Sequence, residues 1–423
     1  MVKRIVAIVL IFILVLVAWL VLAGMTKSRS NQASRELAEE VAALWGDRQV
    51  QPAPTLTFMW ATPDPATKKK HGKKAPQVWH EKPVLLESSA INVDFDLSHR
   101  KKGLLWYATY GLTFAGDYGY VHNEDVAGFL QITARFPSQR AIYDDFHFIV
   151  DGVENPQMTP VDVHDGKAVV EKIPVKPGQP VAFSVAYKSR GLDYWRYTFG
   201  ENVNRVKSFD LAMTTNFRDI DFPDGSMSPT TKNETPNGWQ LEWKFSNLIS
   251  GFDIGMEMPK KLNPGPLAAQ ISFFAPLTLL YFFVWLFVIT LLKKIDLHPM
   301  NYLFLSAAFF SFHLLLAYTV DHLDLLPAFL LSSAVSVVLV ISYLRLAVGL
   351  RFAAVEAGLA QIVYLVLFSY AHFYRGWTGL IVTVGSILTL FLLMQLTGRI
   401  NWAEKFAPRP PVQRPIVPPQ PRP

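Results

Sequence analysis

Six apolar segments constrain the fold of this chain more than any other feature. Each is about 20 residues long, the length that an α-helix needs to cross the hydrocarbon core of a bilayer. The first follows two basic residues, as a signal peptide would. Its apolar run exceeds a signal core and no Ala-x-Ala site follows, which favours an uncleaved anchor. The segments are Ile5–Ala23, Leu267–Leu292, Tyr302–Val320, Leu325–Leu344, Phe352–Ala371 and Trp377–Thr397.

The basic residues outside these segments predict the orientation. With the N-terminus inside, eleven Lys and Arg residues lie on the cytoplasmic side and Arg375 alone lies in the outer loops. Cytoplasmic loops are enriched in Lys and Arg, so we expect both termini inside and the segment between the first two helices outside. That segment, Thr26–Pro266, holds 28 basic and 29 acidic residues, so it offers no broad basic face for nucleic acid.

Composition divides the chain into five predicted parts. Residues 1–25 form the anchor, and residues 26–83 form a juxtamembrane helix over Ser34–Trp45 followed by a linker rich in Pro and Lys. The helix continues the anchor as a stalk or offers an interaction face. The run Lys68–Lys74 in the linker is a solvated loop or a contact with anionic lipid. Residues 84–266 form a β-rich domain, 267–400 a five-helix bundle, and 401–423 a proline-rich cytoplasmic tail.

Alternating apolar and polar residues predict β-strands in the third part. The alternation is clear in Val93–Leu97, Val181–Tyr187 and Leu241–Phe245, between turns rich in Gly, Pro, Asn and Asp. Such a pattern favours antiparallel strands in a β-sandwich-like domain. The predicted fold class is therefore a membrane α-helical protein with six transmembrane helices, both termini inside, and a large extracytoplasmic β-rich domain.

The sequence carries no standard catalytic motif. The absence of Cys excludes disulfides and thiolate chemistry. Asp219–Gly225 resembles a Ca²⁺ loop, but Pro223 and Thr230 stand where oxygen ligands are needed, which favours a turn. Two His-containing acidic clusters, His122–Asp125 and Asp162–Gly166, are too short to supply a zinc site alone. We therefore predict no catalytic residue, metal or cofactor.

Two ionisable residues lie within the predicted membrane helices. His313 lies about twelve residues into the third helix, near mid-bilayer, where ionisable groups are costly and often functional. It is either a neutral histidine hydrogen-bonded to a neighbouring helix or part of a sparse proton path with Glu356. An ion pair with Arg345 or Arg351, which lie nearby in sequence, would also explain Glu356.

The junction of the second and third apolar segments carries the most specific motif. Asp296-Leu-His298-Pro299-Met-Asn-Tyr-Leu303 resembles the Leu-His-Pro-Met-x-Tyr-Leu signature of the CreD family of bacterial inner-membrane proteins. Tyr343-Leu344 before Gly349 and Arg399–Trp402 fit the same pattern, so the resemblance covers Lys294–Trp402. Asn401 stands where Asp is expected and Ala403 where an aromatic residue is usual, which argues against a carboxylate role there.

The resemblance implies a role in cell-envelope integrity or stress response, linked to a two-component regulatory system, the β-lactam response and colicin tolerance. It implies a periplasmic location for the large domain and brings no catalytic residue. The physical reading of His298-Pro299 favours a structural cap over a binding site. Proline is tolerated in the first turn of a helix, and Asp296 or His298 can accept the exposed amides there.

These observations favour a non-enzymatic inner-membrane protein whose β-domain engages envelope components. Its expected partners are the lipid bilayer and an envelope protein or lipid. One alternative is a proton-coupled transporter or lipid-handling protein that uses His313 and Glu356. Another is a periplasmic sensor that relays through the helix bundle to the tail, Pro408–Pro423.

Overall fold

A computed structural model describes residues 2–63, 77–155, 158–164, 166–200, 204–374, 376–398 and 400. The chain divides into two compact units. The helical unit contains the residues up to Gln32 and those from Leu262 onward, and the sheet unit contains Ala33–Lys261. The predicted polybasic run Lys68–Lys74 and the tail Pro408–Pro423 lie outside the described residues.

Within the described residues, six helical spans are long and apolar enough to cross a membrane, as predicted. Their ends lie within three residues of the predicted ones, except that the first helix continues to Trp45. The fifth span alternates π-helical, α-helical and 3₁₀ turns. The bounds are α1 Val2–Trp45, α3 Pro264–Leu292, α4 Pro299–Thr319, α5 Leu325–Ala347, η2 Phe352–Ala357, α6 Gly358–Gln361, η3 Ile362–Leu367, α7 Phe368–Tyr370, η4 Ala371–Phe373 and α8 Thr378–Thr397.

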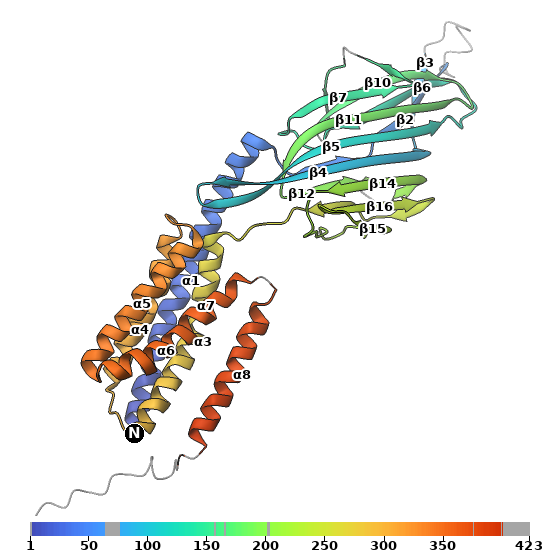
Figure 1. Ribbon diagram of the computed structural model, residues 1–423. Helices are drawn as coiled ribbons and strands as arrows, with labels where there is room; N and C mark the ends of the chain where they lie inside the picture. The colour runs from blue at the N-terminus through green and yellow to red at the C-terminus, as the bar shows by residue number, and fades with distance from the viewer. Residues whose placement is uncertain are drawn as a thin grey trace, which may run out of the picture. The chain divides into compact units, whose positions relative to one another are not determined.

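Large aromatic side chains fill the core of the helical unit. Phe282 of α3 and Phe309 and Phe312 of α4 are fully buried, and Trp19 of α1 packs edge-on against Phe309. Figure 1 shows α1, α3, α4 and α5 running side by side, with α8 set apart from them. Among the described side chains of α8, Thr389 alone is buried. Close packing in the bundle therefore centres on α3 and α4, whereas α1 and α8 bury few of their apolar side chains.

The sheet unit contains the strands. They are β1 Gln49–Pro52, β2 Thr55–Pro63, β3 Gln77–Val84, β4 Ser88–Lys102, β5 Leu105–Val121, β6 Gly128–Arg135, β7 Tyr143–Val150, β8 Val153–Glu154, β9 Val161–Val163, β10 Gly166–Val175, β11 Pro180–Leu192, β12 Tyr194–Thr198, β13 Asn204–Val206, β14 Ser208–Thr215, β15 Thr231–Glu234, β16 Trp239–Phe245, β17 Leu248–Ser250 and β18 Ile254–Glu257.

These strands form four sheets within the described residues. The largest has the order β15-β16-β14-β4-β5-β11-β7-β8, and the next has the order β3-β2-β6-β10-β9. Figure 1 shows the long strands β4, β5 and β11 lying next to one another. Most pairs are antiparallel, but β14 runs parallel to β4 and β1 runs parallel to β12. The predicted predominance of antiparallel strands is therefore present, and these two parallel pairs add to it.

The two larger sheets share one hydrophobic core. The predicted alternation is present in β4, where Ile91, Val93 and Phe95 are buried, and in β11 and β16. Phe58 of β2 and Leu130 of β6 contribute to the same core from the other large sheet. Because side chains of period-2 strands point alternately to opposite faces, each strand gives one face to this core. A sandwich-like packing of the two sheets stays a prediction.

The predicted linker was wrong in its described part. β1, β2 and β3 lie within the segment assigned to a linker between residues 26 and 83, and β2 pairs with both β3 and β6. Here cross-strand pairing prevails over a composition rich in Pro and Lys, and Pro83 is tolerated because β3 is an edge strand.

The end of α1 belongs to the sheet unit. Val41 and Ala42 are buried against Tyr107 of β5 and Leu192 of β11. The ring of Trp45 lies between two guanidinium groups, 3.4 Å from Arg100 and 4.5 Å from Arg190. The last turns of α1 are therefore a packed element of the sheet unit.

Candidate functional site

The connection between α3 and α4, Lys293–Asn301, is tied to three other spans. Asp296 pairs with Arg4 of α1 at 3.2 Å. Lys293 pairs with Glu356 of η2. Asn301 accepts a hydrogen bond of 2.6 Å from Tyr343 of α5. This short connection, which carries the sequence signature, therefore ties α1, η2 and α5 to the junction of α3 and α4 at one end of the bundle.

The signature residues His298 and Pro299 start α4. The Nδ1 of His298 accepts a hydrogen bond from the backbone amide of Met300 at 3.2 Å, and Pro299 occupies the first helical turn. Proline is favoured there because its missing N–H has no helical partner. Leu297 beside them is buried in the core. His298 therefore caps the helix as predicted, while Asp296 forms an ion pair instead.

Glu356 pairs with a residue that the sequence analysis did not name. Its carboxylate contacts Lys293, so the expected pairing with Arg345 or Arg351 was wrong. Glu356 lies in the π-helical turn η2, whose wider winding shifts the direction of its side chains. One carboxylate oxygen, Oε2, is buried and has no hydrogen-bond partner among the described residues. The pair is thus partly desolvated on the carboxylate side.

At the other end of its membrane span, α1 also contacts the end of α4. The guanidinium of Arg29 pairs with Asp321 at 3.2 Å, donates to the carbonyl of Ala317 and lies 4.8 Å from the ring centre of Tyr318. A cation at the C-terminus of a helix also interacts favourably with its dipole. Arg4 and Arg29 are separated by about 37 Å of helix at the α-helical rise per residue. This exceeds the roughly 30 Å hydrocarbon core, so both charges can reach the headgroup regions.

His313 lies fully buried in an aromatic environment. Its ring contacts Trp19 edge-on at 5.7 Å and Phe312 at 4.9 Å between ring centres. Both ring nitrogens lack a hydrogen-bond partner in the described part of the chain. The expected hydrogen bond to a neighbouring helix is therefore absent. Glu356 is held instead by Lys293, so the described contacts do not form the predicted path between it and His313.

Other buried polar groups of the bundle were missed by the sequence analysis. The indole nitrogen of Trp19 and the Oγ of Ser272 also lack partners among the described residues. His372 of η4 is an electrostatic neighbour of His313, and its Nε2 is likewise unpaired. Nothing in the one-dimensional spacing of these residues indicated that four elements would bring them into one bundle interior.

A hydrogen-bonded chain of polar groups crosses the same interior. The amide of Gln361 donates to the Oγ of Ser336 at 2.7 Å, and Ser336 donates to the carbonyl of Ala308 at 2.7 Å. It joins α6, α5 and α4. Ser336 is a small polar residue of the kind that allows two membrane helices to pack closely and to hydrogen-bond.

The sheet unit carries an exposed aromatic face on its five-stranded sheet. The register places Trp79 of β3 opposite Ala61 and Phe129 of β6 opposite Met59, so their side chains share one side of the sheet. The Trp79 and Phe129 rings lie 6.1 Å apart, and the Nζ of Lys172 in β10 lies 5.1 and 5.0 Å from their centres. Trp79 is 50% exposed. We call Trp79, Phe129 and Lys172 the aromatic face.

Within the described residues, no group of three or more His, Asp or Glu side chains is placed to hold a metal ion. His122 is instead buried in the sheet unit, with its ring nitrogens near the Tyr120 hydroxyl at 3.1 Å and the Val126 carbonyl at 2.8 Å. These contacts are those of a buried core residue, so His122 does not need a metal ion to explain its position.

Comparison with known proteins adds family information. The family model described as inner membrane protein CreD matches residues 1–403. No curated protein sequence matches the chain. Among solved structures, a proposed nutrient-binding protein from Legionella pneumophila aligns at 10% identity over 47% of this chain and 71% of its own, with a TM-score of 0.31. An M1 zinc metallopeptidase from Deinococcus radiodurans aligns at 7% identity over 41% and 42%, with a TM-score of 0.23.

Proposed function

Because the chain belongs to the CreD family of inner membrane proteins, we propose that it acts without catalysis in maintaining the cell envelope. Six spans anchor it in the inner membrane, and the sheet unit engages an envelope component. The loop charges support a periplasmic sheet unit, with eleven basic residues on the opposite side of the membrane.

The aromatic face is the observation that carries this engagement. Exposed apolar area on a sheet commonly marks an interaction site, and aromatic ring faces stack against sugar rings or partner side chains. Trp79 and Phe129 present such rings side by side, and Lys172 adds a cation between them. The surface suits a ligand with an apolar ring face and a nearby acidic or polar group, as envelope glycans and proteins offer.

Complementation tests the proposal. A strain lacking the gene should lose viability in detergent and in β-lactam, and the wild-type gene should restore it. The double variant Trp79→Ala/Lys172→Ala should restore it poorly while reaching the membrane at normal levels. Val153→Ala removes an apolar side chain from β8 that is even more exposed than Trp79, and should restore viability fully.

The outcomes separate the two parts of the proposal. An unchanged phenotype after gene deletion would remove the envelope role itself. Full rescue by the double variant would keep that role and exclude the aromatic face from it.

A second function is favoured by one observation: the ring nitrogens of His313 are buried and have no partner in the part of the chain that the structure describes. An ionisable group inside a membrane bundle without a partner is a functional candidate by default, because such a group is costly to keep. A proton-coupled transport role predicts that His313→Ala and His313→Gln both abolish protection while expression and insertion stay normal. Rescue by either variant would leave the non-transport proposal standing.

A further inference from the structure

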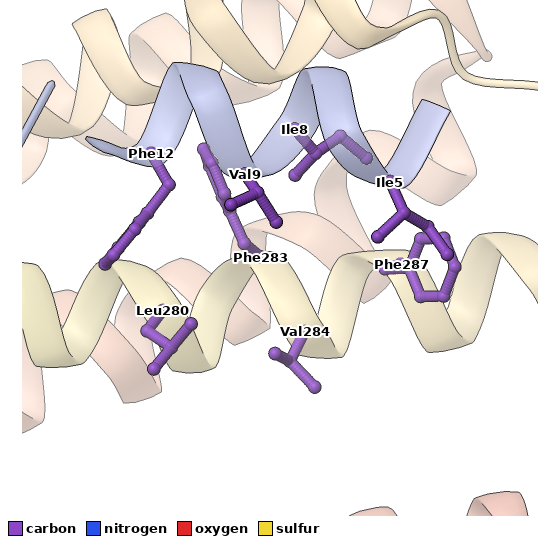
Figure 2. Close-up of a pocket in the computed structure, with 8 residues that line it drawn as sticks. All are labelled: Ile5, Ile8, Val9, Phe12, Leu280, Phe283, Val284 and Phe287. Atoms are coloured by element: carbon purple, nitrogen blue, oxygen red, sulfur yellow. The ribbon is translucent and has the colours of Figure 1, made fainter. Parts of the chain in front are cut away.

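Two hollows lie along the seam between α1 and α3 in the helical unit. The first has a volume of 190 Å³ and is lined by apolar side chains alone, among them Ile5, Val9 and Phe12 of α1 and Leu280 and Val284 of α3. Figure 2 shows Phe12 extending from α1 toward α3 and Phe283 extending from α3 toward α1. The second is larger, 510 Å³, and has a mixed lining.

The two hollows open on the same side of the seam. On α1, the lining residues Ile5, Val9 and Phe12 of the first hollow are followed by Leu20, Gly24 and Lys27 of the second. Residues three and four apart share one face of an α-helix, and this spacing continues through both sets. The lining of α3 repeats the same spacing, from Gln270 and Phe273 to Leu280 and Val284. We call this side of the α1–α3 seam, with its two hollows, the groove; residues 13–19 and 274–279 separate the hollows and line neither of them.

The groove changes from apolar to polar along its length. Its second hollow ends in Lys27 and Asn31 of α1 and Gln270 of α3, and its lining contains no acidic residue. Lys27 is exposed and makes no ion pair within the described part of the chain. It lies two residues before Arg29, which is placed at the headgroup level by the length of α1. An unpaired cation thus stands where phospholipid phosphates lie.

Gly24 supports a role for the hollow itself. A Cβ atom added at this position would meet no atom within 4 Å, so close packing does not require a glycine here. The residue lies within a regular helix, where glycine is about 1 kcal/mol less favourable than alanine. Because it has no side chain, Gly24 leaves the second hollow open between Leu20 and Lys27. The sequence thus keeps an unfavourable residue at the place where an occupant would need space.

We propose that the α1–α3 groove binds one anionic phospholipid. Its phosphate contacts Lys27, the amides of Asn31 and Gln270 donate to the headgroup, and an acyl chain runs past Gly24 along Leu20 and Phe273 of the second hollow. An anionic lipid is favoured over a zwitterionic one because the cation has no acidic neighbour in the lining. This site is independent of the aromatic face and of the function proposed for it.

Native mass spectrometry of the full-length protein tests the site. Purified protein in detergent is titrated with phosphatidylglycerol or with phosphatidylcholine of the same acyl chains. We expect one phosphatidylglycerol to bind more tightly than phosphatidylcholine. Lys27→Gln should weaken its binding about fivefold, the effect of one basic residue near a phosphate. Lys27→Arg should retain it.

A steric pair of variants tests the position of the acyl chain. Gly24→Leu fills the groove without a clash and should reduce binding of both lipids. Gly379→Leu in α8, where an added Cβ also meets nothing within 4 Å, should leave binding unchanged. Equal binding of both lipids by all variants would overturn the proposal and indicate non-selective annular lipid. Loss of binding with Gly379→Leu as well as Gly24→Leu would also overturn it, since the effect would then lie outside the groove.

Discussion

The hydroxyl of Tyr343 donates a hydrogen bond of 2.6 Å to the side-chain oxygen of Asn301, joining the last turns of α5 to the first turn of α4. Both residues lie in segments that match the family signature in sequence. Their contact shows how those segments are related in the fold. It joins the α3–α4 connection to α5 through two residues that lie 42 positions apart.

Tyr343→Phe should lower the free energy of unfolding by about 1 kcal/mol, the usual net value of one hydrogen bond. Unfolding by SDS in mixed micelles measures this difference. If the two side chains interact, the double variant Tyr343→Phe/Asn301→Ala should lose less stability than the sum of the losses in the two single variants. Strictly additive single effects would show that the two side chains do not interact.

The ion pair of Lys293 and Glu356 should respond unequally to loss of each partner. Glu356 has a buried oxygen, so Lys293→Met leaves a partly desolvated carboxylate without its counter-ion. We expect Lys293→Met to be less stable than the double variant Lys293→Met/Glu356→Gln, again in SDS unfolding. The reverse order of stability would mean that the carboxylate is well solvated without Lys293.

The cap at the start of α4 predicts a graded series. His298→Ala removes the acceptor for the Met300 amide and should cost about 1 kcal/mol. His298→Asn replaces it with a side chain that caps helices well and should restore most of the loss. A functional role for the imidazole, rather than a cap, would instead appear as failure of His298→Asn in complementation despite normal stability.

The helical spans could be predicted from the sequence, but the ion pairs that join them could not. Hydropathy alone located every span, because a bilayer requires long apolar helices. The pair between Arg4 and Asp296 joins positions 292 residues apart, and no local pattern encodes such a contact. For Glu356, nearness in sequence favoured Arg345 and Arg351, whereas the π-helical turn directs it to Lys293.

The sheet unit shows the same division between local and distant information. Alternation in β4, β11 and β16 was readable because one face of each strand is buried. β1 was not readable, since its parallel partner β12 lies about 145 residues later and its own sequence, with Gln49 and Gln51 buried, lacks an apolar face. The side-chain Nε2 of Gln49 donates to the Ser189 hydroxyl and the Arg190 carbonyl, contacts that only the folded chain provides.

A pH-dependent contact lies on the β7–β8 hairpin. The carboxylates of Glu154 and Asp145 accept hydrogen bonds from His147 at 2.8 and 3.1 Å and raise its pKa above 6.5. Lys188 and then His147 lower the pKa of Asp145 below 3.8. The His147 contribution to stability is full below pH 6.5 and is lost as the pH rises through the raised value. The Asp145 contribution is full above pH 3.8 and is lost as the pH falls through the lowered value.

The hairpin contacts should therefore be strongest between pH 3.8 and 6.5. NMR of the protein labelled at histidine should give a titration midpoint above 6.5 for the signal that His147→Gln removes. Glu154→Gln should move that midpoint down, because it removes the larger of the two contacts. A midpoint at or below 6.5 in the unaltered protein would show that the ring is not held by the carboxylates in solution.

The membrane orientation can be tested without background, because the chain contains no Cys. Ser228 is exposed in the sheet unit, and Arg351 is exposed in the short segment between α5 and η2. The charge asymmetry of the loops predicts that they lie on opposite sides of the membrane. In spheroplasts, a membrane-impermeant maleimide should label Ser228→Cys and spare Arg351→Cys. In inverted inner-membrane vesicles it should label Arg351→Cys and spare Ser228→Cys. Reversed labelling would place the sheet unit in the cytoplasm and remove the basis for periplasmic engagement through Trp79 and Phe129.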